Sequence, residues 1–131
     1  QKNKWGRIIN VTSVSVKEPL NYLVLSNSIR SAVVAWAKSL SVDIGKEGIT
    51  INSILTGYFD TERIKELNKE KSKSLNISED EVLEKMKSLV PVNRLGKIDE
   101  YGYLVSFLSS DKAAYINGAS IPIDGGLLKS Y

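Results

Sequence analysis

The chain has 131 residues, of which 42% are hydrophobic and 25% are charged, so it is long enough to bury the core of one globular domain. Its net charge is only +3, and acidic and basic residues are intermixed over 60–90, which favours a solvated helical surface over a nucleic-acid-binding patch. The absence of cysteine and histidine excludes disulfides and thiol catalysis and removes the commonest metal ligand and general base, so we predict no metal site. No apolar run approaches the ~18 residues that a membrane-spanning helix needs.

The first predicted elements are a strand and a long helix. Residues 7–12 include the apolar Ile8, Ile9 and Val11, which predicts a strand buried on both faces. After a loop over 14–21, apolar residues recur at helical spacing over 23–44, which predicts a helix that Gly45 and Gly48 stop. The residues of this apolar stripe are Leu25, Ile29, Val33, Trp36, Leu40 and Ile44.

A second strand and several shorter helices are predicted next. The strand covers 49–55, and a charged helical segment follows over 60–90. Inside that segment, Ser78 and Glu81 have the spacing of a capping box. A further helix, capped by Asp99, is expected to end near residue 109.

A short strand over 120–123 completes the pattern. Pro122 has no N–H to donate to a neighbouring strand, so this strand should lie at an edge of the sheet. The order strand, helix, strand, helices, strand implies right-handed crossovers and a parallel sheet. With three strands, the sheet should keep an open edge at 7–12.

Five segments of the chain resemble those of a known family when they are taken together. The segments are 6–13, 32–40, 48–52, 91–96 and 117–126. In this order they resemble the C-terminal half of the short-chain dehydrogenases/reductases, most closely the 3-oxoacyl-[acyl-carrier-protein] reductase branch. The resemblance implies an α/β fold, namely the C-terminal portion of a doubly wound Rossmann-type parallel sheet with three strands and flanking helices.

The same resemblance implies how the domain is organised. Residues 1–131 would be the C-terminal part of one Rossmann-fold dehydrogenase domain. The glycine-rich dinucleotide-binding half of such a domain is not found in this sequence. We therefore expect the chain by itself not to bind a cofactor.

The resemblance also implies candidate catalytic residues. Ser13 would hold the substrate carbonyl and stabilise the developing oxyanion, or else only satisfy a turn at the end of a strand. Ser26 and Arg30 stand where the family has its catalytic tyrosine and lysine. Because an aliphatic hydroxyl is a much weaker acid than a phenol, Ser26 is alternatively a helix-start serine, and Arg30 binds the nicotinamide ribose or makes a structural ion pair. Tyr22, one turn earlier, is a substitute proton donor or an ordinary loop tyrosine.

A second group of residues is implied to contact an NAD or NADP cofactor. The group consists of Arg30, Thr56, Gly57, Phe59 and Thr61. Thr56 stands where the family usually has proline, and Gly57 allows the chain to approach a ligand closely. Thr61 would contact the carboxamide or a phosphate, cap the next helix, or do both. The segment 58–90 is expected to be a helical lid over the substrate, the alternative being a solvated helical pair.

Three functional hypotheses remain open. The first is an NAD(P)-dependent oxidoreductase that reduces a carbonyl or oxidises an alcohol. The second is a non-catalytic paralogue that binds a ligand or forms oligomers, and the third is an assembly remnant that binds no cofactor. The resemblance implies a cytoplasmic homo-oligomer, dimer or tetramer, without nucleic-acid or membrane partners. Its contacts would involve Val33, Trp36, Ala37 and Leu40, together with Ile121 and the helix 98–109.

Overall fold

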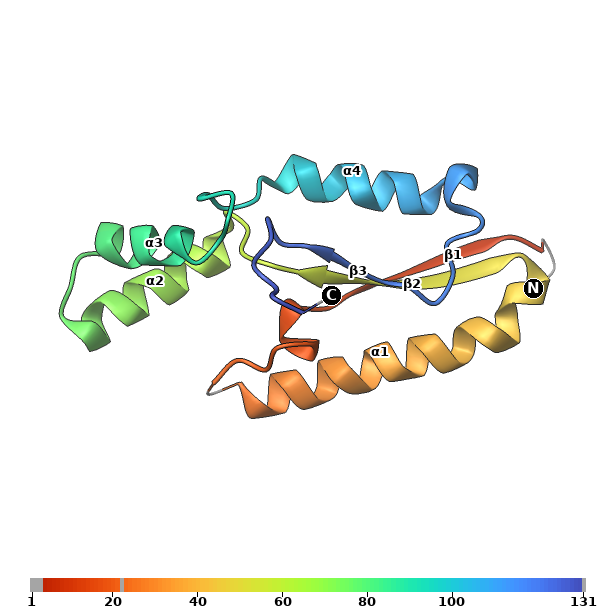
Figure 1. Ribbon diagram of the computed structural model, residues 1–131, viewed down its shortest axis with the longest axis horizontal. Coiled ribbons are helices and arrows are strands. Elements are labelled where there is room, and N and C mark those ends of the chain that lie inside the picture. The colour runs from red at the N-terminus through yellow and green to blue at the C-terminus, as the bar shows by residue number, and fades with distance from the viewer. Residues whose placement is uncertain (1–3, 22, 131) are drawn as a thin grey trace.

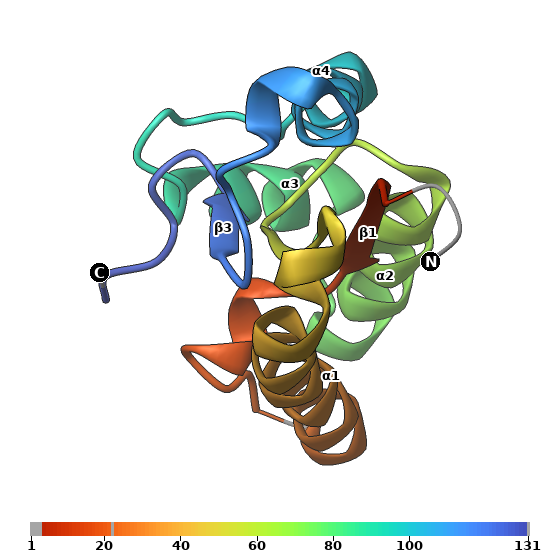
Figure 2. The ribbon, with the colours of Figure 1, turned by 90° about the vertical axis from the view of Figure 1, so that its right-hand side faces the viewer.

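The computed structural model describes residues 4–21 and 23–130. Three parallel strands form one sheet in the order β1–β2–β3. Helix α1 lies along one face of the sheet and α4 along the other, while α2 and α3 form a pair beyond one end of it (Figures 1 and 2). The elements are β1 (Gly6–Val11), η1 (Val14–Val16), α1 (Val24–Ile44), η2 (Gly45–Glu47), β2 (Ile49–Thr56), α2 (Glu62–Leu75), α3 (Glu79–Ser88), α4 (Ile98–Ser109), η3 (Asp111–Ala113) and β3 (Ser120–Ile123).

The central strand β2 is the core of the fold. Its residues Ile51, Ile54 and Leu55 are completely buried, because the strand pairs on both sides and is covered by helices on both faces. Leu108 of α4 and Ala113 pack with Ile54 in one buried cluster. The parallel sheet, with β3 at its edge, confirms the predicted α/β architecture.

Strand β1 is the other edge of the sheet, which agrees with the open edge predicted at 7–12. The expectation that it is buried on both faces is wrong, because Ile8 is 37% and Val11 62% exposed. The strand pairs only with β2, and α1 packs chiefly on β2, so part of β1 remains uncovered. A row of apolar side chains on an unpaired edge is a surface that another strand can cover.

The apolar stripe of α1 does not face the sheet as a whole. Small residues, Ala37 and Ser41, are buried against the rest of the chain. Leu25, Ile29 and Trp36 are 73%, 56% and 52% exposed. The helix therefore packs closely on the sheet through small side chains, while Val33, Leu40 and Ile44 of the stripe are only half-buried.

Two predicted helix boundaries need correction, and one is confirmed. Gly45 has helical dihedrals and continues into η2, so only Gly48, with a φ of 71°, ends the helical run. Asp99 does not cap α4, because the helix begins one residue earlier, at Ile98, and Glu100 accepts a hydrogen bond from the N–H of Lys97. The capping box of Ser78 and Glu81 at the start of α3 is present.

Candidate active site at the carboxyl ends of the strands

The predicted site residues lie around one end of the sheet. Strands β1 and β2 both run toward the end where α1 begins and where α2 and α3 lie (Figure 1). Ser13 follows β1, Thr56 ends β2, and Ser26 is in the first turn of α1. In open parallel sheets, ligands bind at the carboxyl ends of the strands, which makes this end the candidate site.

Ser13 begins a tight turn directly after β1. The backbone N–H and hydroxyl of Thr12 both donate to the carbonyl of Ile54, each at 2.9 Å, so the pairing of β1 with β2 extends up to Ser13. The hydroxyl of Ser13 accepts a hydrogen bond from the N–H of Ser15 at 3.1 Å and caps η1. Ser13 therefore does satisfy a turn at the end of the strand, which was one of its two predicted roles. Its half-buried hydroxyl still has a proton that it can donate to a ligand.

Ser26 and Arg30 form a pair on α1. The Nε of Arg30 donates to the hydroxyl oxygen of Ser26 at 3.2 Å, and both side chains are half-buried. Four residues separate them, so the helix places them on one face. Because Nε is only one of the five N–H donors of a guanidinium, the other donors can serve a ligand.

Three predicted catalytic residues are thus placed, with one direct contact among them. Ser26 is bonded to Arg30, whereas the hydrogen bonds within 4–21 and 23–130 do not join Ser13 to either. The turn that Ser13 caps packs against α1, the helix that carries Ser26 and Arg30. Tyr22, the substitute proton donor, lies outside the described residues.

The loop after β2 is held closely by its own chain. The hydroxyl of Thr56 lies 3.1 Å from that of Tyr101 on α4, and one donates to the other. The N–H of Gly57 donates to the carbonyl of Ile123 at 3.1 Å. A Cβ at Gly57 would lie 2.6 Å from the Cα of Asp124, so close approach to Asp124 is a sufficient reason for glycine here.

Phe59 is a buried anchor of the same loop. It is 8% exposed and pairs in a β-bridge with Gly96. Its ring meets the ring of Tyr101 edge-on, with centroids 5.3 Å apart. A Cβ at Gly96 would lie 2.6 Å from the ring of Phe59, so that glycine makes room for the aromatic side chain.

Thr61 caps the helix that follows. Its hydroxyl accepts from the N–H of Ile64 at 3.4 Å at the start of α2, which confirms the capping alternative for this residue. The hydroxyl proton is still available to a ligand. The segment 58–90 is helical as predicted, and α2 packs against α3.

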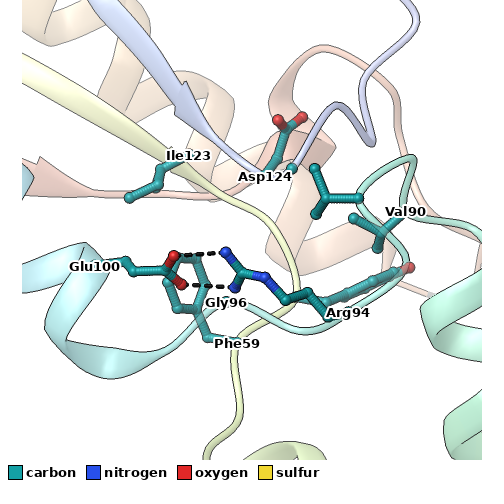
Figure 3. Close-up of a pocket in the computed structure, with 10 residues that line it drawn as sticks. Phe59, Val90, Arg94, Gly96, Glu100, Ile123 and Asp124 are labelled. Carbon is teal, nitrogen blue, oxygen red and sulfur yellow. Dashed lines mark hydrogen bonds and ion pairs between the residues drawn. The ribbon is translucent and has the colours of Figure 1, made fainter.

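A cavity of about 160 Å³ lies beside this loop (Figure 3). It is lined by residues drawn from 58–59, 90–96 and 123–125 and by Glu100. Of the predicted site residues that the structure describes, Phe59 alone lines it. Ser13, Ser26 and Arg30 are not among the residues that line the cavity.

An ion pair stands at this cavity. Arg94 donates two hydrogen bonds to the carboxylate of Glu100, at 2.8 and 2.6 Å, and Figure 3 shows the two side chains face to face. The guanidinium, together with the N–H of Lys97, lowers the pKa of Glu100 to about 2. The pair joins the loop before α4 to the first turn of that helix, and Phe59 packs against Gly96 of this loop.

Sequence reasoning missed the residues that support the site. Tyr101 bonds Thr56 and Asp124 lies against Gly57, which are contacts between distant segments that periodicity does not reveal, and Glu100 pairs with Arg94 six residues earlier. Glu18 accepts hydrogen bonds from residues more than a hundred positions away, which no local pattern indicates. Two short runs in the sequence could have indicated these supporting residues, because in each a charged residue stands close to glycine. The runs are Asp124-Gly125-Gly126 and Arg94-Leu95-Gly96.

Comparison with known proteins agrees with this architecture. A family model described as "Enoyl-(Acyl carrier protein) reductase" matches residues 1–128. The NADPH-dependent reductase BacG of Bacillus subtilis is 32% identical over 130 residues, covering 99% of this chain and 50% of BacG. The 3-oxoacyl-[acyl-carrier-protein] reductase FabG of Pseudomonas aeruginosa is 31% identical over 133 residues, covering 98% of this chain and 48% of FabG. The structure of L-sorbose reductase from Gluconobacter frateurii, complexed with NADPH and L-sorbose, aligns with a TM-score of 0.92 at 27% identity, covering 99% of this chain and 50% of that one.

The chain therefore belongs to the short-chain dehydrogenase/reductase family. It spans about half the length of the curated relatives it matches. Its three-stranded sheet with flanking helices matches the C-terminal half of their Rossmann-type fold. None of the helices in the described residues has the length and apolar character needed to cross a bilayer.

Proposed function

We propose that this chain supplies the substrate side of the active site of an NAD(P)-dependent carbonyl reductase. The reverse reaction, alcohol oxidation, uses the same groups. The observation that carries the proposal is the Ser26–Arg30 hydrogen bond at the start of α1, at the sheet end where ligands bind in parallel folds. Relatives that bear NADPH in their names, and the FabG relative that acts on a 3-oxoacyl group, support this reaction class.

The residues of this chain would hold and protonate the substrate oxygen. When bound, the reduced nicotinamide supplies a hydride to the carbonyl carbon. The Ser13 hydroxyl donates a hydrogen bond to the oxygen as negative charge develops on it. A proton must then reach that oxygen to give the alcohol, and we assign its delivery to Ser26.

Ser26 is a weak acid by itself, and Arg30 is the reason it can act. A cationic donor on the hydroxyl oxygen favours the deprotonated form and polarises the O–H bond. The 3.2 Å bond from Nε places the guanidinium in this position. A serine still remains a weaker acid than the tyrosine of the family, so we expect slow turnover.

The residues present fit a nicotinamide cofactor in part. Arg30 has N–H donors beyond Nε for ribose hydroxyls, and Thr61 can donate its hydroxyl proton while it caps α2. Thr56 is engaged with Tyr101, and the space at Gly57 is filled by Asp124. Arg30, Thr61 and the backbone near Phe59 are therefore the groups that we assign to the cofactor, and the dinucleotide-binding half is required for full affinity.

The same proposal covers the lid and the assembly state. The α2–α3 pair, within 58–90, lies at the site end of the sheet, where it can cover a substrate (Figure 1). The exposed Leu25, Ile29 and Trp36 of α1 form an apolar surface that suits a homo-oligomer contact. Ala37 is 2% exposed and so would not take part in that contact.

The experiment uses the parent protein that this proposal implies, meaning this chain together with a dinucleotide-binding half. NADPH consumption with a model ketone is measured for the parent and for the Ser26→Tyr, Arg30→Lys double variant. Because general acid catalysis contributes ~10²–10⁴-fold, the double variant should be clearly faster than the parent. Ser28→Tyr, on the exposed side of the same helix, is the matched control and should leave the rate unchanged.

The outcomes separate the two candidate functions. A fast parent that the double change slows would show that another residue is the acid. If the parent binds NADPH but neither the parent nor the double variant reduces the ketone, the result would favour a non-catalytic paralogue. The family resemblance implies that Ser26 and Arg30 replace the family's Tyr–Lys pair, and loss of the usual proton donor supports this second candidate.

A further inference from the structure

We propose that Glu18 is a positioning residue that fastens the C-terminal segment onto the turn bearing Ser13. This inference rests on the proposed function, because it assigns Glu18 the task of orienting the Ser13 hydroxyl. It concerns a contact between two parts of the chain that are more than a hundred residues apart. The C-terminal segment returns close to the η1 turn (Figure 1).

Glu18 belongs to the same turn as Ser13. The N–H groups of Lys17 and Glu18 both donate to the carbonyl of Val14, at 3.0 and 3.1 Å. Val14 and Ser15 are buried, and Ser13 caps this turn through its bond to the N–H of Ser15. A displacement of Glu18 would therefore shift Ser13, because backbone hydrogen bonds of the turn connect the two residues.

The carboxylate of Glu18 binds the far end of the chain. Its Oε1 accepts hydrogen bonds from the N–H groups of Lys129 and Ser130, at 2.8 and 2.9 Å. Hydrogen bonds from backbone N–H groups to an ionised carboxylate are stronger than those between neutral groups. These two bonds lower the pKa of Glu18, with a smaller contribution from the nearby Lys129 ammonium, so the carboxylate is charged at neutral pH.

A second carboxylate directs the segment toward Glu18. Asp124 accepts from the N–H of Gly126 at 2.9 Å through one oxygen and from that of Leu128 at 2.8 Å through the other. Gly125 and Gly126 have φ values of 65° and 86°, which bend the chain sharply after β3. Asp124 also lies against Gly57 at the end of β2. The segment thus links the ends of β2 and β1 on the side of the sheet where the candidate site lies.

The first test measures the contact itself in this chain, without catalysis. Amide hydrogen exchange is followed at Lys129 and Ser130 for Glu18→Ala, Glu18→Gln and the exposed control Glu70→Ala. Exchange at both amides should become roughly tenfold faster or more in Glu18→Ala, because a charge-assisted acceptor is lost, and less so in Glu18→Gln, which keeps an oxygen. Unchanged exchange in Glu18→Ala would overturn the inference.

The second test measures positioning in the intact parent. Glu18→Ala should lower kcat about tenfold to a hundredfold with little change in KM, since misplacing a group by ~1 Å has effects of this size. Glu18→Gln should restore part of kcat. Faster amide exchange with an unchanged kcat would refute a positioning role. If Ser13→Ala leaves kcat unchanged while Glu18→Ala frees the tail amides, the proposed function fails and the contact between Glu18 and the tail stands.

Discussion

Replacing Gly57 by alanine should destabilise the fold at the end of β2. An added Cβ would lie 2.6 Å from the Cα and 2.7 Å from the Cβ of Asp124, well inside the 3.4–4 Å of an ordinary contact. Backbone atoms cannot rotate away as the tip of a long side chain can. The ends of β2 and β3 must therefore separate, which strains the hydrogen bond from Gly57 to Ile123.

The size of the effect follows from these contacts. Overpacking of this kind costs about 1–3 kcal/mol, and loss of the hydrogen bond would add ~1 kcal/mol. The smaller conformational entropy of alanine in the unfolded chain offsets roughly 0.4–1 kcal/mol. We expect a net loss of about 1–3 kcal/mol in the free energy of unfolding.

Urea unfolding followed by circular dichroism measures this loss. With a slope of about 2 kcal/mol per M, a loss of 2 kcal/mol shifts the midpoint down by about 1 M. Gly102→Ala is the matched control, because Gly102 lies inside α4 with no heavy atom within 4 Å of the added Cβ. It should stabilise the protein by about 0.5–1 kcal/mol. A Gly57→Ala protein as stable as the original would refute the packing argument.

Two further predictions concern the charged and capping residues. Since the folded pKa of Glu100 is about 2, below its ordinary 4.5, its contribution to stability is complete above pH 4.5 and is lost as the pH falls toward 2. Glu100→Gln should flatten the dependence of the unfolding midpoint on pH over that range, and an unchanged slope would contradict the role of Arg94. Ser78→Ala should cost roughly 0.5–2 kcal/mol and speed amide exchange in the first turn of α3, because its hydroxyl accepts from the N–H of Glu81. The same change at Ser88, the last residue of that helix, should have a smaller effect, and equal effects would argue against the capping box.

The elements that sequence patterns predicted well are those with strong local signals. Strands β2 and β3, helix α1 and the capping box of α3 follow from apolar runs, helical spacing and short polar motifs. The burial of β1 was overestimated, because an apolar run does not show how many neighbours cover a strand. Asp99 was a plausible cap by residue type, but the contact of Glu100 with Lys97 defines the helix start.

The support of the candidate site was less predictable for a physical reason. Phe59 and Gly96 pair across a loop, and Glu18 binds the N–H groups of Lys129 and Ser130. Such contacts depend on how distant segments are brought together, and they leave no periodic trace in the chain. Ser26 and Arg30 were proposed as site residues from the family resemblance, and the structure adds the hydrogen bond between them, which their spacing of four residues on one helix allows.

The most direct test of the account is the rate of NADPH-dependent ketone reduction by the intact parent carrying Ser13→Ala. Loss of one donor to a developing oxyanion lowers kcat by ~10²–10³-fold, and we predict a decrease of that order. Ser39→Ala, an exposed serine of α1, should leave kcat unchanged, and the unfolding midpoint of each variant reports any loss of the turn cap. A Ser13→Ala protein that reduces the ketone at the original rate would contradict the assignment of this end of the sheet as the active site.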